Sequence, residues 1–363
     1  MGQEKYHMYC VIMAGGKGTR FWPRSRAATP KQLLDVWGSR TMLQESVERI
    51  SRLVPAEQVT IVTGKKHADA VHRQLPGIPS ENILVEPIGR NTAPCICLAA
   101  LWIQKKDPDA VLAVLAADHY IGDTEEFCRC LEAAAEAALQ QGCLVTIGIN
   151  PAHAETGYGY IQYGEEIGPY KGMPAFRVQK FHEKPNSEKA QEFLQQGNFL
   201  WNSGMFVWKA STILAEIKTF LPDVYNKLLP VQPLLGTPEA QKAIDAAYAA
   251  IEGISIDYGV MEKSARVVTL KGDFGWSDVG SWSAVYDISD KDAQGNVIHG
   301  NVISIDADRN LIYASEKLTA VVGLKDIVVV ETADALLVCS RDQAQDVKKV
   351  VDLLEQKGMK KLL

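Results

Sequence analysis

The stretch "CVIMAGGKGTRFWPRS", residues 10–25, decides the fold, because a short apolar run leads directly into a glycine-rich turn. Residues 10–14 are apolar, as in a buried strand. The turn that follows contains Gly15, Gly16, Lys17, Gly18 and Arg20. Glycine lets the backbone amides approach an anion closely, and the two cations add attraction. The stretch therefore predicts a phosphate-binding loop at the end of a strand.

Two common phosphate-binding motifs do not fit this loop. A P-loop needs G-x-x-x-x-G-K-[ST], but Gly18 follows Lys17 where a serine or threonine is required. A dinucleotide fingerprint needs G-x-G-x-x-G, and Phe21 stands in place of its third glycine. This spacing argues against a dinucleotide-dependent oxidoreductase. A purely structural tight turn and a loop that holds a nucleoside triphosphate both remain. Lys31, in "TPKQLL", adds a further cation suited to a triphosphate.

Short apolar runs alternate with helical patterns through the first half of the chain. The strand candidates are residues 10–14, 59–63, 83–85, 111–117 and 144–149. Thr41 and Gln44 form a capping box, and Asp123 can cap a later helix that ends before Gly142. This alternation predicts an α/β fold with a Rossmann-like, doubly wound parallel sheet. Such sheets bind ligands at the carboxyl ends of their strands, where the glycine loop and Asp118 both fall.

The pattern of apolar and turn-forming residues changes twice after the first half of the chain. Residues 150–285 mix strand and helix patterns, as in an insertion that closes over the ligand edge of the sheet. Beyond residue 290, short β-branched runs alternate with Gly, Asn and Asp, and an amphipathic helix ends the chain. We therefore expect a catalytic domain over residues 1–288 and a small β-rich domain that ends in a helix over residues 289–363.

Composition limits the partners and the compartment. The net charge of −6 argues against a general nucleic-acid binder. No run of 18 apolar residues and no signal peptide are present, so we expect neither a membrane span nor secretion. The seven cysteines fit reduced thiols and a cytoplasmic location. Cys128 and Cys130 point to opposite sides of a predicted helix, which favours structural roles over metal binding.

The segments "MAGGKGTRFWPRS" (13–25) and "TPKQLL" (29–34) resemble the signature of sugar-nucleotide pyrophosphorylases, which join a sugar 1-phosphate to a nucleoside triphosphate. Further segments resemble the mannose-1-phosphate guanylyltransferases within that group: "VEPIGRNTAP" (85–94), "AADH" (116–119), "GYGYI" (157–161), "FHEKP" (181–185), "WNSGMF" (201–206), "SIDYGVMEK" (255–263) and "GWSDVGSW" (275–282). The resemblance covers residues 8–285. It implies a GT-A-like nucleotidyltransferase domain, a β-helix-like tail, and a homodimer.

The reaction that this resemblance implies is GTP plus mannose 1-phosphate giving GDP-mannose and pyrophosphate. The attacking group is already an anion, so the protein must neutralise charge and fix an in-line geometry. The resemblance assigns a divalent cation, Mg²⁺ or Mn²⁺, to Asp118 and Asp278. The structural alternatives are a cap for Asp118 and a turn residue for Asp278. We expect Arg20 and Lys31 to bind the triphosphate, and Lys184 to neutralise the sugar phosphate.

The resemblance also implies residues for the base and the sugar. Glu86 would accept both N–H donors of guanine, and the glycine loop would meet the nucleotide through its backbone. Arg90, Asn91 and Thr92 would contact the nucleotide, although Asn91 and Thr92 could equally cap the next helix. The expected sugar contacts are Gly157, Tyr158, Glu183 and Asn202. Asp257 and Glu262 are expected to be structural supports near the Asp278 loop.

Two alternatives to this reaction remain open at this point. A related nucleotidyltransferase could use another sugar 1-phosphate or another triphosphate. A non-catalytic homologue could bind a nucleotide-sugar and regulate a partner, but it would be expected to lack some of the charged residues, and Arg20, Lys31, Asp118 and Asp278 are all present.

Overall fold

The computed structural model describes residues 7–16 and 18–363. They fall into two compact units, each built from several stretches of the chain. Within the described residues, the first unit comprises residues 7–15, Ser46–Ala117 and Ile121–Trp276. The second comprises Gly16, residues 18–45, Asp118–Tyr120 and Ser277–Leu363. The boundary predicted after residue 288 divides the chain into two continuous domains. The two units are instead groups of residues that contact one another, and each is discontinuous along the chain.

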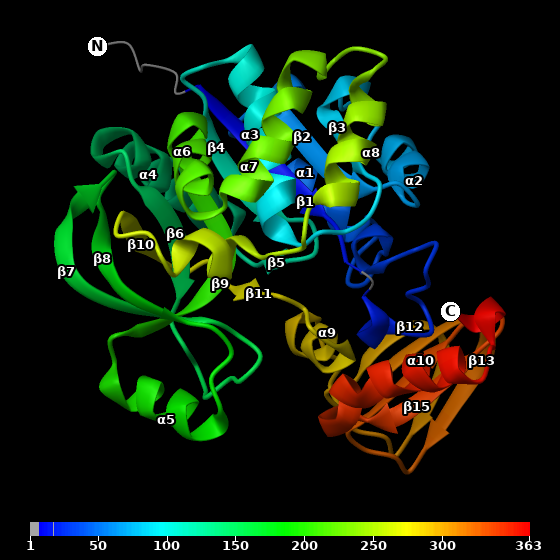
Figure 1. The fold of residues 1–363 in the computed structure, drawn as a ribbon. Coiled ribbons are helices and arrows are strands. Elements are labelled where there is room, and N and C mark those ends of the chain that lie inside the picture. Colours follow the sequence, from blue (N-terminus) through cyan, green and yellow to red (C-terminus); the bar gives the residue numbers. More distant parts are fainter. Residues whose placement is uncertain (1–6, 17) are drawn as a thin grey trace. The chain divides into compact units, whose positions relative to one another are not determined.

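A nine-stranded sheet forms the centre of the first unit, in the order β3-β2-β1-β4-β9-β6-β10-β8-β7 (Figure 1). Its strands are β1 (Met8–Ala14), β2 (Val59–Gly64), β3 (Ile83–Glu86), β4 (Val111–Ala116), β6 (Leu144–Ile149), β7 (Tyr160–Tyr170), β8 (Met173–His182), β9 (Phe199–Lys209) and β10 (Val267–Gly272). The five strands predicted from the first half of the chain are all present, and β3, β2, β1 and β4 are parallel neighbours.

The sheet is mixed rather than wholly parallel. Strand β9 runs antiparallel to both β4 and β6, and β8 runs antiparallel to β10. The β7–β8 ribbon has a physical reason for its direction, because only Lys171 and Gly172 connect the two strands, and both have positive φ (45° and 80°). A two-residue turn of that kind returns the chain antiparallel. The predicted parallel winding therefore applies to the first-half strands.

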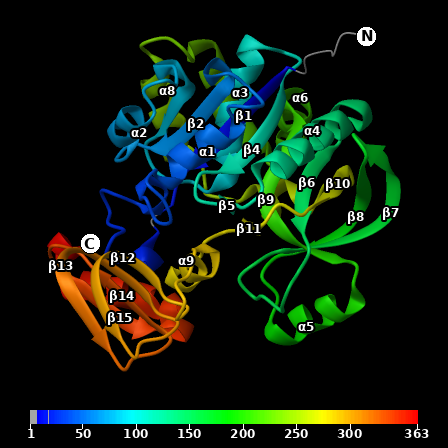
Figure 2. The same cartoon turned by 180° about the vertical axis from the view of Figure 1, so that it is seen from behind.

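Helices cover both faces of this sheet. They are α2 (Ala68–Gln74), α3 (Thr92–Lys106), α4 (Thr124–Gln141), α5 (Ser187–Gln196), α6 (Ala210–Phe220), α7 (Pro222–Leu228) and α8 (Ala240–Ala250), with the π-helical turn η6 (Asp257–Met261). Helix α3 is buried from Ala93 to Ile103 and packs against α6 and α7 on the face shown in Figure 1, whereas α4 covers the face shown in Figure 2. In the described part of the chain, no helix combines the length and the apolar character needed to span a bilayer.

The predicted caps are confirmed. The Asp123 side chain accepts the backbone N–H groups of Glu125 and Glu126, each at 3.0 Å, and α4 ends before the left-handed Gly142. At the start of α1 (Met42–Ile50), Thr41 N–H donates to Gln44 Oε1 at 3.0 Å, and Gln44 N–H donates back to Thr41 Oγ1 at 3.3 Å. These reciprocal bonds form the expected capping box.

The second unit contains a four-stranded sheet in the order β12-β13-β14-β15. Its elements are β12 (Val297–Ile305), β13 (Leu311–Val322), β14 (Ile327–Glu331), β15 (Leu336–Ser340), α9 (Trp282–Ile288), α10 (Val347–Gln356), and the short helices η1 (Thr19–Phe21), η2 (Lys31–Leu33) and η7 (Arg341–Asp346). Strands β12, β13 and β14 are parallel and β15 is antiparallel. The β-rich tail predicted from the sequence is thus present. A separate small sheet pairs β5 (Tyr120–Ile121) with β11 (Trp276–Ser277).

The loop after the glycines packs into the hydrophobic core of the second unit. The rings of Phe21 and Trp282 lie 5.1 Å apart, and Trp282 Nε1 donates to the carbonyl oxygen of Trp22 at 3.2 Å. Trp22 Nε1 in turn donates to the carbonyl oxygen of Leu362 at 2.9 Å. All three aromatic residues are buried, so the "FWP" part of the opening stretch acts as an anchor to the C-terminal elements.

Candidate active site

A cavity of about 370 Å³ in the second unit brings together four residues that the sequence predicted for phosphate and metal binding. They are Arg20, Lys31, Asp118 and Asp278. The remaining lining residues are Gly18, Thr19, Phe21, His119 and Gly280. These positions lie up to 262 residues apart in the sequence, between Gly18 and Gly280, so the fold assembles the cavity from three stretches of the chain.

Lys31 is the fixed cation of this cavity. Its side chain is only 7% exposed, and Nζ donates to Asp118 Oδ2 at 3.0 Å and to the backbone carbonyl oxygen of Asp278 at 2.7 Å. The ammonium also lies 5.3 Å from the centre of the Phe21 ring, which adds a cation–π contact. The ammonium is therefore held in one place before any ligand arrives.

Asp118 carries a negative charge in this setting. Burial raises the pKa of its carboxyl, but Lys31 and His119 together outweigh burial, and the pKa lies below the ordinary value. The side chain is still 34% exposed, so the carboxylate can reach a ligand in the cavity. Asp118 follows β4, where a doubly wound sheet presents ligand-binding groups.

Asp278 sits in a strained turn. The next residue, Val279, has a φ of 46°, which is rare for a β-branched residue, and its side chain is fully buried in the core. Val279 N–H donates to Ser277 Oγ at 3.1 Å. A side chain at Gly280 would place its Cβ 3.2 Å from Asp278 Oδ2. The buried valine and the close glycine together fix the Asp278 backbone beside Lys31.

Gly18 has a steric role that the sequence did not reveal. Its φ is 59°, in the left-handed region, and a Cβ there would lie 2.5 Å from Lys31 Cβ and 2.9 Å from Lys31 N. No atom lies within 4 Å of a Cβ built on Gly15 or Gly16. Gly18 therefore makes room for Lys31, while the earlier glycines leave open backbone. Lys17, also predicted to bind the nucleotide, lies outside the described residues.

Arg20 is the second cation of the cavity. Its side chain is exposed, and it makes no hydrogen bond or ion pair with the residues that the structure describes. An arginine that lines a cavity without an internal partner can give its planar donors to a phosphate. The cavity thus combines one fixed and one available cation.

The donor set of this cavity fits a hard divalent cation. Asp118 and Asp278 both line it and supply carboxylate oxygens, which Mg²⁺ and Mn²⁺ prefer. No group of three or more His, Cys, Asp or Glu side chains arranged for a metal occurs in residues 7–16 and 18–363. Mg²⁺ is usually bound by one or two carboxylates together with substrate phosphates and water, so two aspartates are sufficient here.

Glu86, at the end of β3 in the first unit, is a buried carboxyl group. It is 7% exposed, and its Oε1 has no hydrogen-bond partner among the described residues. Burial raises the pKa of Glu86 to about 7, opposed by the neighbouring Tyr248 hydroxyl. Buried polar atoms without a partner are rare in proteins, so this oxygen is suited to a ligand donor.

The segment after Glu86 has structural contacts at each predicted nucleotide-binding residue. Arg90 Nε donates to the carbonyl oxygen of Tyr248 at 3.1 Å. Asn91 has a φ of 67° and its Oδ1 accepts the N–H of Thr92 at 2.9 Å, at the start of α3. Thr92 Oγ1 accepts the N–H of Ile256 at 2.8 Å. The cap expected as an alternative role of Asn91 is thus present, and the nucleotide contacts of the three residues stay a prediction.

Glu183 and Lys184 form an ion pair in the first unit. Lys184 has a φ of 46°, a strained conformation of the kind found at binding sites. Burial lowers the pKa of Lys184, whereas Glu183 raises it more strongly, so the net shift is upward and the ammonium stays charged. A Cβ at Gly159 would lie 2.4 Å from Glu183 Oε2, so this glycine gives the Glu183 carboxylate its space.

Asn202 is held by three neighbours. Its Oδ1 accepts the N–H of Gly204 at 3.2 Å and the hydroxyl of Thr146 at 3.4 Å, while its Nδ2 donates to Asp257 Oδ1 at 2.8 Å. Burial raises the pKa of Asp257 to about 6, and the Glu183 charge adds to the effect. Asp257 was expected to support the Asp278 loop. In the structure its carboxylate bonds to Asn202, a predicted sugar contact, and its support of the Asp278 loop stays a prediction.

The other predicted sugar residues lie in an aromatic setting. Gly157 N–H donates to Glu155 Oε1 at 2.7 Å. The Tyr158 ring makes edge contacts with Trp201 and Trp276, at centroid distances of 5.2 and 5.3 Å. Rings packed in this way form a rigid wall.

The chain matches two protein-family models. Residues 9–295 match the model of the nucleotidyl transferase family, and residues 300–354 match that of the "MannoseP isomerase/GMP-like beta-helix domain". The chain belongs to the nucleotidyl transferase family. The first match includes the predicted site residues of both units. The second match covers the four-stranded sheet of the second unit.

Relatives within this family are similar over nearly the whole chain. Mannose-1-phosphate guanylyltransferase of Escherichia coli K12 is 43% identical over 366 residues, covering 99% of this chain and 75% of that protein. The protein of the same name from Salmonella muenchen is 44% identical, covering 95% and 73%. A crystal structure named mannose-1-phosphate geranyltransferase, from Thermus thermophilus, is 34% identical with a TM-score of 0.86, covering 96% of this chain and 99% of that one.

Two arginines of this nucleotidyl transferase have contacts that the sequence left unassigned. Arg24 donates to Asp35 Oδ1 at 2.5 Å and to the Asp35 carbonyl oxygen at 2.8 Å, and its guanidinium lies 4.4 Å from the centre of the Tyr313 ring. Arg26 pairs with Asp334 at 2.7 Å. Both side chains thus tie residues 21–26 to the C-terminal part of the second unit. No local pattern signals such contacts, because Tyr313 and Asp334 are about 300 residues away.

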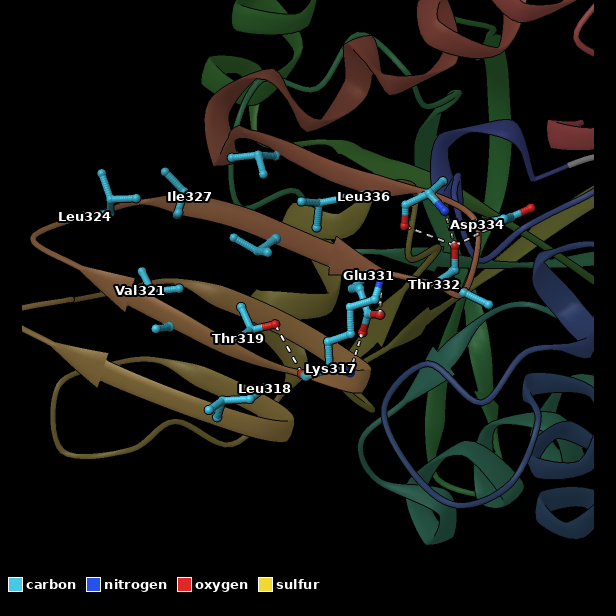
Figure 3. Close-up of a pocket in the computed structure, with 15 residues that line it drawn as sticks. Lys317, Leu318, Thr319, Val321, Leu324, Ile327, Glu331, Thr332, Asp334 and Leu336 are labelled. Atoms are coloured by element: carbon cyan, nitrogen blue, oxygen red, sulfur yellow. Dashed lines mark hydrogen bonds and ion pairs between the residues drawn. The ribbon is translucent and has the colours of Figure 1, made fainter.

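A second hollow of the nucleotidyl transferase chain, of about 590 Å³, lies on the C-terminal sheet (Figure 3). Apolar side chains from β13, β14 and β15 line it, among them Leu318 and Leu336, which are both 59% exposed. At one end, Lys317 lies 3.9 Å from Glu331. The sequence did not predict this surface, because period-2 strands can expose either face.

Proposed function

We propose that this protein transfers GMP from GTP to mannose 1-phosphate, giving GDP-mannose and pyrophosphate. The observation that carries the proposal is the cavity in which Lys31 and Arg20 meet Asp118 and Asp278, because it combines one fixed and one available cation with carboxylates for a divalent metal. The names of the relatives supply the substrates. Mg²⁺ or Mn²⁺ is the proposed cofactor, held by Asp118 and Asp278.

The chemistry is an in-line displacement at the α-phosphorus of GTP. A phosphate oxygen of the sugar 1-phosphate forms a bond to that phosphorus, and the bond from the same phosphorus to the bridging oxygen of the β-phosphate breaks. Pyrophosphate leaves with that electron pair, and no proton has to be removed from the attacking oxygen. The metal would supply charge neutralisation between the two anions. Lys31 and Arg20 stabilise the negative charge that develops on the triphosphate.

Residues of the first unit would recognise the base and the sugar. Glu86 accepts the two adjacent N–H donors of guanine, a pair that adenine cannot offer, and its buried unpartnered oxygen supports that role. Glu183 and Asn202 bind sugar hydroxyls, and Lys184 neutralises the sugar phosphate. Gly157 and Tyr158 would shape the sugar site, and the backbone of residues 15–18 would meet the nucleotide.

The decisive experiment is a matrix of pyrophosphate-release assays with Mg²⁺. GTP, ATP, UTP and dTTP are each tested with mannose 1-phosphate and with glucose 1-phosphate. We expect release mainly from GTP with mannose 1-phosphate. Release mainly with another pair would overturn the assigned substrates. No release with any pair, from folded protein that binds nucleotide, would favour a non-catalytic homologue.

A substitution tests the metal assignment separately. Asp118→Asn keeps the shape of the side chain but removes the charge that would hold the cation. We expect the variant to lose turnover while it keeps the far-ultraviolet circular dichroism of the unmodified protein, with a lower unfolding temperature because buried Lys31 loses its charge partner. Normal turnover by this variant would remove Asp118 from the metal site.

We also propose a cytoplasmic homodimer. All seven cysteines are free, which fits a reducing compartment. The hollow on the C-terminal sheet supports a second copy as the partner, because its exposed Leu318, Leu336 and Val338 form an apolar surface of the kind that protein contacts cover. Light scattering should give the mass of a dimer, and Leu336→Asp should shift it to that of a monomer. A monomeric unmodified protein would overturn the proposal.

A further inference from the structure

The segment before Asp257 is fixed to the start of α3 by three hydrogen bonds. Ile254 N–H donates to the carbonyl oxygen of Arg90 at 3.1 Å, and the N–H of Ala93 donates to the carbonyl oxygen of Ile254 at 3.1 Å. Ile256 N–H donates to Thr92 Oγ1 at 2.8 Å. These bonds have the same effect as a short strand pairing. The backbone that carries Asp257 is therefore rigidly placed relative to the predicted nucleotide segment.

The hydrogen bonds around Asn202 fix which way its amide points. Two donors, the Thr146 hydroxyl and the Gly204 N–H, meet Oδ1, so the opposite side of the amide must be the NH₂ group. That group faces Asp257 Oδ1 at 2.8 Å. Asp257 thus accepts a hydrogen bond from Asn202. If the Asn202 amide were turned by 180°, its NH₂ group would face the Thr146 hydroxyl and the Gly204 N–H, with no acceptor for the latter.

The surroundings of Asp257 contain the other groups predicted for the sugar. A Cβ built on Gly159 would lie close to both Glu183 Oε2 and, at 3.4 Å, Asn202 Cβ, so the Glu183 carboxylate lies beside the residue that bonds to Asp257. Consistent with this placement, Glu183 raises the pKa of Asp257 and Lys184 lowers it. Asn202 N–H donates to the carbonyl oxygen of Gly159 at 2.8 Å, and Gly159 is also the residue that gives Glu183 its space. Asn202 and Glu183 therefore flank one glycine, with Asp257 bonded to one and charge-coupled to the other.

A neighbouring buried donor also lacks a partner. Trp201 precedes Asn202, is 6% exposed, and its Nε1 makes no hydrogen bond with the described residues. A buried indole N–H normally finds an acceptor. Side chains of consecutive strand residues point to opposite faces, so Trp201 lies on the other face of β9 from Asn202, and its N–H is not part of the group around Asp257.

We propose that Asp257 is a specificity-determining residue of the sugar site, whose carboxylate accepts a hydrogen bond from a ring hydroxyl of the hexose 1-phosphate while it holds Asn202 in position. This inference rests on the proposed function. A hydroxyl that meets a charged acceptor gives strong discrimination, because an analogue without that hydroxyl leaves the carboxylate unsatisfied. Lys184 is the cation for the phosphate, and Asp257 and Glu183 serve the neutral hydroxyls.

Binding of GDP-mannose and of GDP to Asp257→Asn tests the proposal by calorimetry without requiring turnover. We expect GDP-mannose to bind about 10- to 100-fold more weakly than to the unmodified protein, as for loss of a charged hydrogen bond, with GDP affinity unchanged. Glu262→Gln is the matched control, because Glu262 lies in the same electrostatic group but has no bond to Asn202. It should bind both ligands normally.

A kinetic cycle separates direct contact from a purely structural role. Monodeoxy analogues of mannose 1-phosphate are compared in the unmodified protein, Asp257→Asn and Thr146→Val, which disturbs Asn202 without touching Asp257. If Asp257 contacts a hydroxyl directly, removal of that hydroxyl lowers the kcat/KM of the unmodified protein strongly. The same removal lowers the kcat/KM of Asp257→Asn only slightly, because that variant has already lost the contact. Thr146→Val should instead remain sensitive to the analogue that lacks this hydroxyl.

The outcomes distinguish this inference from the proposed function. Two results would overturn the role of Asp257 while leaving the reaction intact. In the first, each analogue lowers the kcat/KM of Asp257→Asn by the same factor as that of the unmodified protein. In the second, Asp257→Asn binds GDP-mannose as tightly as the unmodified protein does. If the unmodified protein itself binds GDP-mannose no better than GDP and turns over no mannose 1-phosphate, the proposed function fails first, and the inference fails with it.

Discussion

Lys31 Nζ donates to Asp118 Oδ2 at 3.0 Å, and the two side chains differ sharply in exposure, 7% for Lys31 and 34% for Asp118. The cation is buried and fixed, whereas the carboxylate it neutralises still reaches the cavity. A divalent metal bound to Asp118 would therefore share this carboxylate with Lys31. The pair thus couples the proposed phosphate-binding cation to the proposed metal ligand.

Lys31→Met should abolish most turnover, because methionine keeps the unbranched stem but removes the charge. We expect a loss of at least about 100-fold in kcat, as for other groups that stabilise a developing anion. Pyrophosphate release is the measurement, and Lys348→Met, on the exposed side of α10, is the control. Turnover near that of the unmodified protein would show that Lys31 has no part in the reaction.

Gly18→Ala should damage the site through Lys31. The added Cβ would lie 2.5 Å from Lys31 Cβ, and alanine is strained at a φ of 59°. We expect a loss of turnover similar to that of Lys31→Met, with far-ultraviolet circular dichroism unchanged. Gly38→Ala is the matched control, because nothing lies within 4 Å of a Cβ there. If both variants keep full activity, Gly18 is not needed to place Lys31.

Glu86→Gln should change stability in a pH-dependent way. The pKa of Glu86 is raised from 4.5 to about 7, so the folded protein favours the neutral carboxyl. The stability linked to Glu86 is then complete below pH 4.5 and is lost as pH rises through about 7. Glutamine does not titrate, so the variant should gain stability relative to the unmodified protein over this range, by up to about 3 kcal/mol.

Urea unfolding of Glu86→Gln at several pH values measures this difference, and the exposed Glu81→Gln serves as the control. The KM for GTP should rise in Glu86→Gln while the KM for mannose 1-phosphate stays nearly constant. A stability difference that does not vary between pH 4.5 and 7 would contradict the raised pKa of the buried Glu86 carboxyl. An equal rise in the KM values for GTP and for mannose 1-phosphate would count against Glu86 as the guanine-binding residue.

Trp282→Ala should destabilise the second unit and inactivate the enzyme, because Trp282 packs on Phe21 and bonds to the Trp22 carbonyl group. Removal of a fully buried tryptophan side chain costs about 3–5 kcal/mol. Trp282→Phe keeps most of the packing and loses the N–H donor, so about 1 kcal/mol is expected. Leu353→Ala, 52% exposed on α10, should change little in urea unfolding. Similar values for all three would refute the anchor role.

The sequence predicted those parts of the site that depend on local order. Asp118 follows an apolar strand, and the end of such a strand is a ligand position in this class of sheet. The Thr41–Gln44 box and the Asp123 cap depend on residues within four positions of each other, so short patterns reveal them. The parallel strands of the first half were predictable for the same reason.

Long-range contacts could not be predicted in this way. Asp257 bonds to Asn202, which is 55 residues away, and nothing in "SIDYGVMEK" points to that partner. The need for glycine at position 18 arises from Lys31 Cβ, which only the fold places there. Strand β9 enters antiparallel between β4 and β6, and its own sequence contains no signal of direction. Such features follow from tertiary packing rather than from local preference.

The discontinuous second unit has a consequence for the order of events during synthesis on the ribosome. Lys31 leaves the ribosome early, but its partner Asp278 follows 247 residues later, and the Trp282 ring that anchors Phe21 comes later still. At about 5–20 residues per second, this delay lasts roughly 12–50 seconds. Through that period the glycine loop lacks these packing partners, so the proposed phosphate-binding cavity can form only after residue 282 has left the ribosome.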